Sequence, residues 1–302
     1  MTSKKKSEKR EVAFSAKFLN KMTQITIKKA SGERVPFDPD KVLRSINRSG
    51  VEGEKAQKIL EKVKANLTPG ITTDEIYRLV REELKQESPA AHARYNLRQS
   101  LLKLGPAGFN FEKYVASILT AYGYKTQLPH ELEGACVSHE VDVIAEKDGR
   151  RMFIEAKFRN RFEDVVNIKD TMATWARYLD LVDGAKINLC PHFDEAWIVT
   201  NARFTDHALK YGHCKNMVMI GWNHPKERTF ARMVDLSSLY PITLIEDMND
   251  QEFQAFAQKD IILCREIAEK EPVNLSKKTG IKEARMKKLI ERCTQIVGEK
   301  HK

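Results

Sequence analysis

The sequence has few cysteines and no long apolar segment, and both absences narrow the class of protein. Its 302 residues include five cysteines, an odd number without a Cys-x-x-C pair. That usage favours reduced thiols over a disulfide framework or a zinc ribbon. No apolar run approaches the length of a membrane span, and the N-terminal residues lack the apolar core of a signal peptide. We therefore expect a cytoplasmic protein that does not enter a membrane.

Basic residues, in contrast, are in excess. Lysine and arginine number 52 against 42 aspartates and glutamates, which gives a formal net charge of +10. They recur in short clusters, as at 4–6, 28–29 and 277–278. Such clusters favour nucleic acid as a partner, because phosphate contacts give affinity without sequence specificity. Residues 1–23 are expected to be a disordered basic arm, either a solubilising tail or a DNA contact.

A predicted hairpin carries the residues that suggest chemistry. Apolar residues alternate with Glu155 and Lys157, so the two charged side chains share one face of a predicted strand. The apolar segment around Asp142 is typical of a partner strand, and Asp148-Gly149 between them is a strong hairpin signal. Pairing the strands brings Asp142 close to Glu155.

These residue types suit phosphodiester hydrolysis. Mg²⁺ is usually held by one or two carboxylates together with water and phosphate oxygens. Asp142, Glu155 and the backbone carbonyl of Ala156 would form that metal site, and Lys157 is placed to orient or polarise the attacking water. Glu112, at the start of a predicted helix, would hold a second metal or support the first.

The Glu-x-Lys pattern by itself carries little information, because 31% of the residues are charged. Glu83 and Lys85 repeat it on a predicted helix, and a solvated strand face would also show it. Catalysis is favoured by the combination of an apolar flank, a hairpin and two further acids.

Three predicted elements follow one another: the helix that begins near Glu112, the strand that contains Asp142, and the strand that contains Glu155 and Lys157. Over residues 106–245 they resemble the PD-(D/E)XK nuclease fold, and more closely the Mrr-like restriction endonucleases. The resemblance implies a metal-dependent DNA endonuclease that uses Mg²⁺ or Mn²⁺. It assigns catalytic roles to Glu112, Asp142, Glu155 and Lys157. The family often has glycine where this chain has Glu140, which leaves open which carboxylates bind the metal.

A second pattern precedes the nuclease-like segment. Two short predicted strands flank Gly32, and four predicted helices follow them. Lysines beside a glycine turn and a helix start form an anion site. Over residues 24–105 this layout resembles the ATP-cone domain, the nucleotide-sensing module of ribonucleotide reductases and their repressors. The resemblance implies binding of ATP or dATP through Lys28, Lys29, Gly32, Lys41, Thr73 and Arg98. The alternative is a cone that serves only as a docking module.

Residues 246–302 are predicted to be helical, with helices near 250–270, 274–279 and 282–297. The turn at Gly280 is similar to a helix-hairpin-helix element, which binds the DNA backbone. A helical dimerisation subdomain fits the same pattern.

Together these segments predict a multidomain protein of the α+β and α/β classes. After the basic arm come a β-hairpin with a helical bundle, an α/β domain with a mixed sheet, and a C-terminal helical subdomain. The predicted function is a nucleotide-regulated DNA endonuclease related to restriction or defence, and a homo-oligomer is compatible with it. Two alternatives stay open: a non-catalytic, nucleotide-sensing DNA-binding regulator, and a repair or RNA nuclease. Reductase repressors with this cone carry a four-cysteine zinc ribbon, which this chain lacks.

Overall fold

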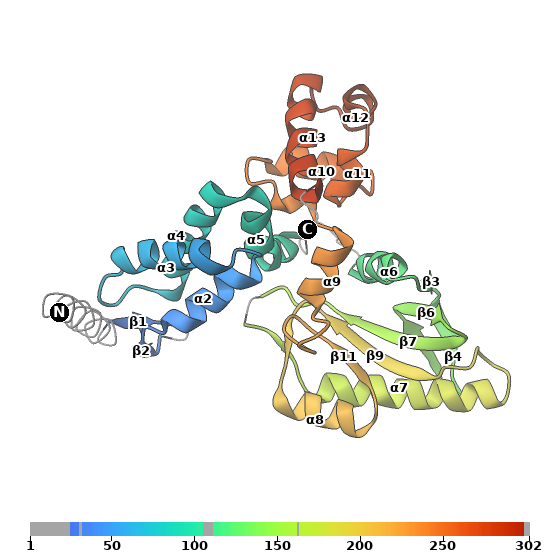
Figure 1. Cartoon of the computed structure of the whole chain (residues 1–302). Helices are drawn as coiled ribbons and strands as arrows, with labels where there is room; N and C mark the ends of the chain where they lie inside the picture. The colour runs from blue at the N-terminus through green and yellow to red at the C-terminus, as the bar shows by residue number, and fades with distance from the viewer. Residues whose placement is uncertain (1–24, 30–31, 105–110, 162, 299–302) are drawn as a thin grey trace, which may run out of the picture. The chain divides into compact units, whose positions relative to one another are not determined.

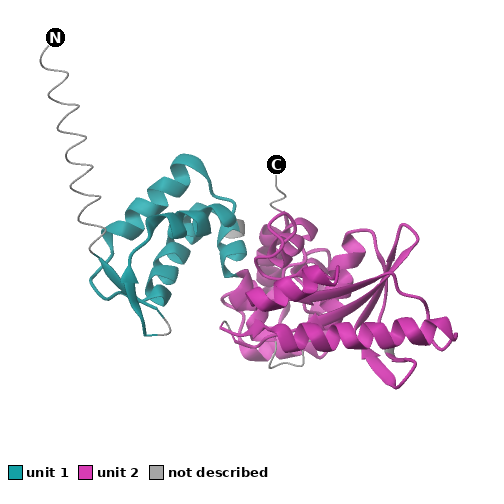
Figure 2. Cartoon of the chain, turned by 90° about the horizontal axis from the view of Figure 1, so that it is seen from below, with its two compact units in different colours: residues 1–96 teal, residues 97–302 magenta. Residues whose placement is uncertain are grey.

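The computed structural model describes residues 25–29, 32–104, 111–161 and 163–298. The basic arm expected at 1–23 lies outside these residues. The chain divides into two compact units, residues 1–96 and 97–302, with the boundary inside helix α5, Pro89–Leu104 (Figure 2). The four-part division expected from the sequence stays a prediction. None of the described helices is long and apolar enough to cross a membrane.

The first unit is a β-hairpin followed by helices, as the sequence predicted. Strands β1 and β2 pair antiparallel, and helices α2, α3 and α4 follow them (Figure 1). These elements span Thr26–Lys28, Arg34–Pro36, Pro39–Arg48, Gly53–Ala65 and Thr73–Glu87. Asp38 caps α2 by accepting the backbone N–H of Lys41, and Thr72 forms a capping box with Glu75 at the start of α4. The helices share a core that includes Ile46, Ile59, Val63, Val80 and Leu84.

A five-stranded mixed sheet lies at the centre of the second unit, which confirms the expected architecture. The strand order is β11-β9-β7-β6-β3. Strands β3, β6 and β7 pair antiparallel, whereas β7, β9 and β11 pair parallel. Their bounds are Lys125–Gln127 (β3), Val143–Lys147 (β6), Arg150–Lys157 (β7), Glu195–Thr200 (β9) and Val218–Ile220 (β11). Two smaller pairs are β4 (His130–Glu133) with β5 (Ser138–Val141), and β8 (Val165–Val166) with β10 (Arg203–Phe204).

Helices cover both faces of this sheet, with α6 on one face and α7 and α8 on the other (Figure 1). The helices of this domain are α6 (Phe111–Ala121), α7 (Ile168–Lys186), α8 (Asp206–Cys214) and α9 (Phe230–Ser237). Because both faces are covered, the middle of the central strands is apolar and buried, as at Met152–Ile154 of β7 and Ala196–Val199 of β9. The sequence pattern predicts a helix over 165–181, but its start was wrong. Val165 and Val166 form β8, and Asn167 caps α7 by accepting the N–H groups of Lys169 and Asp170.

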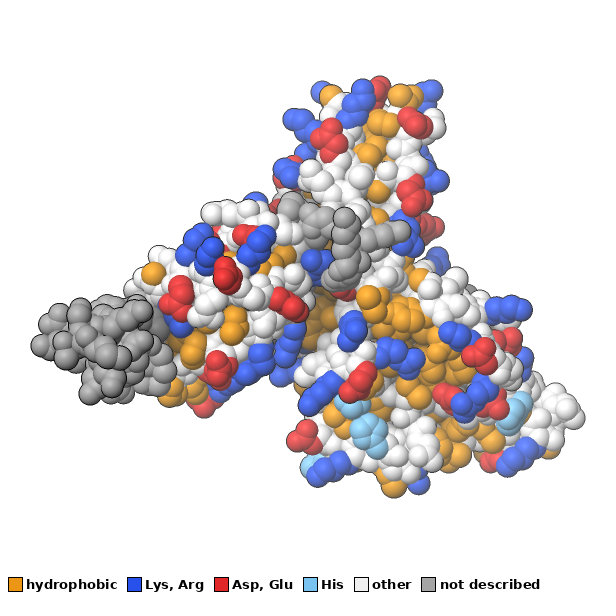
Figure 3. All heavy atoms as spheres, in the orientation of Figure 1, with side chains coloured by type: hydrophobic (Ala, Val, Ile, Leu, Met, Phe, Trp, Pro, Cys, Tyr) orange, Lys and Arg blue, Asp and Glu red, His pale blue; other side chains and the backbone are white. Residues whose placement is uncertain are grey.

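The C-terminal region is helical, but the single helix predicted over 250–270 was wrong. It is divided into α10 (Asp250–Ala257) and α11 (Cys264–Ala268). The division follows from Asp260, whose φ of 57° is left-handed and ends the helical path. The remaining helices, α12 (Pro272–Thr279) and α13 (Glu283–Gly298), flank the left-handed Gly280 as expected. Acidic and basic side chains are interspersed over these helices at the top of Figure 3.

One carboxylate of α7 makes several contacts with the β4–β5 hairpin. Asp180 of α7 accepts hydrogen bonds from the backbone N–H groups of Cys136 (2.9 Å) and Val137 (3.3 Å) and contacts the His139 ring at 2.8 Å. A Cβ atom on Gly184 would lie 2.9 Å from the carbonyl carbon of Gly134, so the backbones approach closely here. The hydrogen bond from His139, followed by those from Cys136 and Val137, lowers the pKa of Asp180 to about 2.

This carboxylate gives an acid-dependent prediction. Because the folded pKa of Asp180 lies below the unfolded value, its contribution to stability is present above about pH 4 and is lost as pH falls toward 2. We expect Asp180→Asn to lower the free energy of unfolding at pH 6, and the difference from wild type to shrink at pH 3.5. Urea unfolding at both pH values measures this. Glu131→Gln, an exposed change on the same hairpin, should show no such convergence; equal losses for Asp180→Asn at both pH values contradict the assignment.

Candidate active site

The hairpin between β6 and β7 brings two acids together. Asp148 (φ 53°) and Gly149 (φ 77°) form its turn, and Val143 pairs with Ile154 at the opposite end. Asp142 is the next residue in this register and lies opposite Glu155. Its Oδ2 accepts the backbone N–H of Ala156 at 2.7 Å.

The sequence predicted that Asp142 lies inside one continuous strand. In the structure it lies between β5 and β6. The interruption frees its carboxylate to turn toward Ala156 on the neighbouring strand. Glu140, the acid at the family's glycine position, is exposed on β5. The structure therefore distinguishes the two acids by burial and by hydrogen bonding.

Glu155 is the most buried acid of the site, with 2% of the residue exposed. Lys157 reaches one carboxylate oxygen from the same strand, and Arg177 of α7 reaches the other. Arg177 also donates to the backbone carbonyl of Glu140 at 3.2 Å. A buried carboxylate held by two cations is stable because its charge is compensated.

Arg177 was not assigned a role from the sequence. It is the single basic residue of α7 between Lys169 and Lys186, which was the available signal. Its contact with Glu155 joins residues 22 positions apart and depends on how α7 crosses the sheet.

Asp142 has an unusual titration for an aspartate. Burial is the main cause that raises its pKa to about 6, and the charges of Glu155 and then Glu112 add to the effect. The Ala156 N–H and Lys157 act in the opposite direction. Glu112, in the first turn of α6, thus influences Asp142 through its charge. A cation near Asp142 would relieve this repulsion.

The donor set fits a hard divalent cation. Among the residues that the structure describes, no group of three or more His, Cys, Asp or Glu side chains is placed to hold a metal. Asp142 and Glu155 supply two carboxylates close together, and their use as metal ligands with the Ala156 carbonyl stays a prediction. One or two carboxylates completed by water and phosphate oxygens are the usual environment of Mg²⁺. All five cysteines are free, and none belongs to a group of three or more possible metal-binding side chains within the described part of the chain.

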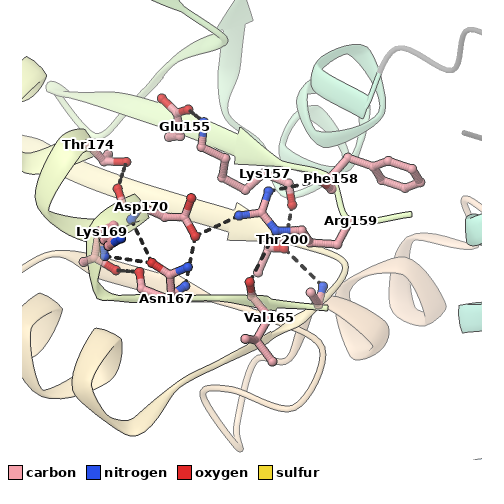
Figure 4. A network of polar contacts seen from close by, with 12 residues as sticks. Glu155, Lys157, Phe158, Arg159, Val165, Asn167, Lys169, Asp170, Thr174 and Thr200 are labelled. Atoms are coloured by element: carbon pink, nitrogen blue, oxygen red, sulfur yellow. Dashed lines mark hydrogen bonds and ion pairs between the residues drawn. The ribbon is translucent and has the colours of Figure 1, made fainter. Parts of the chain in front are cut away.

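Neighbouring elements fix the end of β7, as Figure 4 shows. The Thr200 hydroxyl donates to the Lys157 carbonyl at 2.5 Å, and the Asn201 side chain bonds both the N–H (2.8 Å) and the carbonyl (2.9 Å) of Arg159. Arg159 in turn forms an ion pair with Asp170 of α7 at 2.8 Å. Since Thr200 and Asn201 are buried, Lys157 extends from a rigid backbone.

The first unit brings Lys28 next to the start of α4. The N–H of Lys28 donates to the Ile71 carbonyl at 3.0 Å, and Lys28 forms a bridge with Thr72, directly before Thr73. Gly32 (φ 84°) closes the turn of the hairpin. Helix N-termini favour anions, so this corner combines a lysine with a partial positive charge.

The other predicted nucleotide contacts differ in setting. Lys29 is paired with Glu33 at 2.8 Å, and Lys41 lies 3.6 Å from Asp38. Arg98 belongs to the second unit, where its guanidinium lies 5.7 Å from the centroid of Trp222 and 6% of the residue is exposed. Burial and the charge of Arg203 lower the pKa of Arg98 to about 10. Its role toward a nucleotide stays a prediction.

Comparison with known proteins gives three successive matches. Family models match the ATP cone domain over residues 25–100, a restriction endonuclease domain (Mrr_cat) over 106–223, and the AF1548-like C-terminal domain over 240–297.

Individual relatives agree with these matches. An uncharacterized protein of Archaeoglobus fulgidus is 28% identical over 184 residues, 61% of this chain and 100% of that protein. A crystal structure of AF1548, a protein of unknown function, has a TM-score of 0.52 and 28% identity, and covers 64% of this chain and 100% of its own. The transcriptional repressor NrdR of Xanthobacter autotrophicus is 33% identical over 82 residues, 24% of this chain and 45% of the repressor. The matched segment is thus less than half of that repressor. This chain carries an ATP-cone domain, an Mrr-type restriction-endonuclease domain and an AF1548-like C-terminal domain.

Proposed function

We propose that this protein is a metal-dependent DNA endonuclease whose activity is regulated by a nucleotide, ATP or dATP. The observation that supports it best is the buried Glu155, held by Lys157 and Arg177 and facing Asp142 across the β6–β7 pair. A solvated strand face would not hold a carboxylate at 2% exposure between two cations. A role in restriction or defence follows from the likeness to restriction endonucleases.

Each residue of the site has a part in phosphodiester hydrolysis. Asp142, Glu155 and the Ala156 carbonyl would hold Mg²⁺ or Mn²⁺. When bound, the metal supplies Lewis-acid stabilisation of charge on the phosphate and leaving oxygen. The Lys157 ammonium orients the attacking water and compensates negative charge near Glu155. Glu112 adds negative charge beside Asp142 and so favours cation binding.

Arg177 positions Glu155 rather than touching substrate. We expect Arg177→Ala to slow cleavage about 10- to 100-fold, the range seen when a partner of a metal ligand is removed. Arg177→Lys keeps the charge but loses the planar fork, and should recover part of the rate. Cleavage rates across a Mg²⁺ titration separate weaker metal binding from slower chemistry. Lys186→Ala, an exposed change on the same helix, is the control; wild-type rates for Arg177→Ala at every Mg²⁺ concentration exclude this role.

One alternative has an observation of its own. The likeness of the N-terminal segment to NrdR favours a nucleotide-sensing DNA-binding regulator that keeps the nuclease fold without cutting. Incubation of supercoiled plasmid with the protein and Mg²⁺ or Mn²⁺, with and without EDTA, distinguishes the two functions. Metal-dependent nicked or linear product supports the endonuclease. Binding of DNA without any product, on duplex, branched and RNA substrates, supports the regulator.

A further inference from the structure

Exposed apolar side chains gather in one region of the second unit. Among the described residues eight large hydrophobic residues are exposed, and six of them lie on α7, just after it, or on the β4–β5 hairpin attached to it. The six are Val137, Ile168, Met172, Leu179, Ile187 and Leu189. Helix α7 lies below the sheet in Figure 1 and toward the viewer in Figure 2. Apolar surface concentrated in this way marks an interaction site.

The outward face of α7 has an ordered pattern of residue types. Its exposed positions include Lys169, Met172, Ala173, Ala176, Leu179 and Asp183. The middle of the face is therefore uncharged, with Lys169 near one end and Asp183 and Lys186 near the other. Lys169 lies seven residues before Ala176 and Asp183 lies seven residues after it. Seven residues are close to two helical turns, so both charges share the face of Ala176, each about 10 Å away along the axis.

We propose that this face packs against the same face of a second copy of the chain, with the two α7 helices antiparallel and the two-fold axis at Ala176. An isologous contact requires a surface that is complementary to itself. In this register Lys169 of one copy faces Asp183 of the other, and the pair occurs twice. Ala173 faces Leu179, so that a small residue opposes a large one on each side of the axis.

The composition of the face selects a protein partner over DNA. A polyanion needs a row of cations, whereas the central positions Met172, Ala173, Ala176 and Leu179 carry no charge. Alanine at the crossing point lets two helices approach within the usual 8–10 Å between axes. Asp183 is already within 2.7 Å of Lys186, but both side chains are more than half exposed and leave the carboxylate accessible to a second cation.

The apolar surface extends beyond the helix, as a stable dimer requires. A helix of 19 residues is about 28 Å long, and one helix pair alone buries less than the roughly 1,200 Å² of a specific interface. In the antiparallel arrangement Ile168 of one copy meets the end of α7 in the other, where Ile187 and Leu189 follow. Exposed apolar residues therefore continue the contact at both ends.

Sedimentation velocity of the full chain without DNA, from about 1 to 100 µM, tests the proposal independently of the endonuclease function. We expect a dimer for wild type, and for Ala176→Glu or Leu179→Glu a dissociation constant at least about tenfold higher. Leu236→Glu, at an exposed leucine of α9, is the matched control and should remain dimeric. Circular dichroism and thermal unfolding verify that each variant is folded.

Charge reversal tests the register. Lys169→Asp and Asp183→Lys should each weaken the dimer, because each places like charges opposite one another, and the double variant should restore it. A wild-type chain that is monomeric throughout the concentration range overturns the proposal. A dimer that Ala176→Glu and Leu179→Glu leave intact overturns it as well. A double variant no stronger than the single ones contradicts the antiparallel register.

Discussion

Asp142→Asn is expected to abolish metal-dependent DNA cleavage, with a loss of about 10²- to 10⁴-fold, and Lys157→Ala is expected to have an effect of similar size. Asparagine keeps the oxygen that accepts the Ala156 N–H but removes the charge that would bind the metal. Lys157 supplies the ammonium beside Glu155. Conversion of supercoiled plasmid to nicked and linear forms at saturating Mg²⁺ measures both losses.

The chain offers matched controls for this experiment. Glu140→Ala removes the exposed acid two residues before Asp142, and Glu83→Ala removes the acid of the second Glu-x-Lys pattern on α4. Both should cut DNA at the wild-type rate. Loss of cleavage in Glu140→Ala with full activity in Asp142→Asn would reverse the assignment of the metal ligand. Thermal unfolding of each variant in EDTA shows whether a variant that does not cut DNA is still folded.

The second large effect concerns the nucleotide. We expect the double variant Lys28→Ala/Lys29→Ala to bind ATP about 10- to 100-fold more weakly than wild type, because one charge-assisted contact to phosphate is worth about 1.5–3 kcal/mol and Lys29 is already paired with Glu33. Lys28 stands beside the start of α4, where the helix end also favours an anion. Isothermal titration calorimetry with ATP and with dATP measures both affinities.

Lys55→Ala/Lys58→Ala is the matched control. It removes two exposed lysines of α3 in the same unit, so its net charge equals that of the Lys28/Lys29 double variant. Its nucleotide affinity should match that of wild type. Equal affinity of the Lys28/Lys29 double variant and wild type excludes this corner as the phosphate site. If wild type binds neither nucleotide, the cone serves as a docking module. Cleavage assays with added ATP then show whether a bound nucleotide changes the rate.

Local sequence patterns were sufficient for much of the architecture. The Asp148-Gly149 turn predicted the β6–β7 hairpin. Asp38 predicted the start of α2, and Thr72 or Thr73 that of α4, where the structure has Thr72 as the cap. The period of two along β7 placed Glu155 and Lys157 on one face. These features depend on hydrogen bonds and rotamers of residues only a few positions apart, so the nearby sequence contains the information that fixes them.

Other features depend on residues far apart in the chain. The sequence did not predict the interruption at Asp142, the contact of Arg177 with Glu155, or the burial of Arg98 beside Trp222. Each requires a partner from another strand, helix or loop whose position is set by packing of the whole unit. The sequence by itself determined the order of the elements and the residue types available for catalysis. Tertiary structure decided which acids face one another and that Arg177 joins Lys157 in holding Glu155, because burial and long-range contacts exist only after the elements have packed.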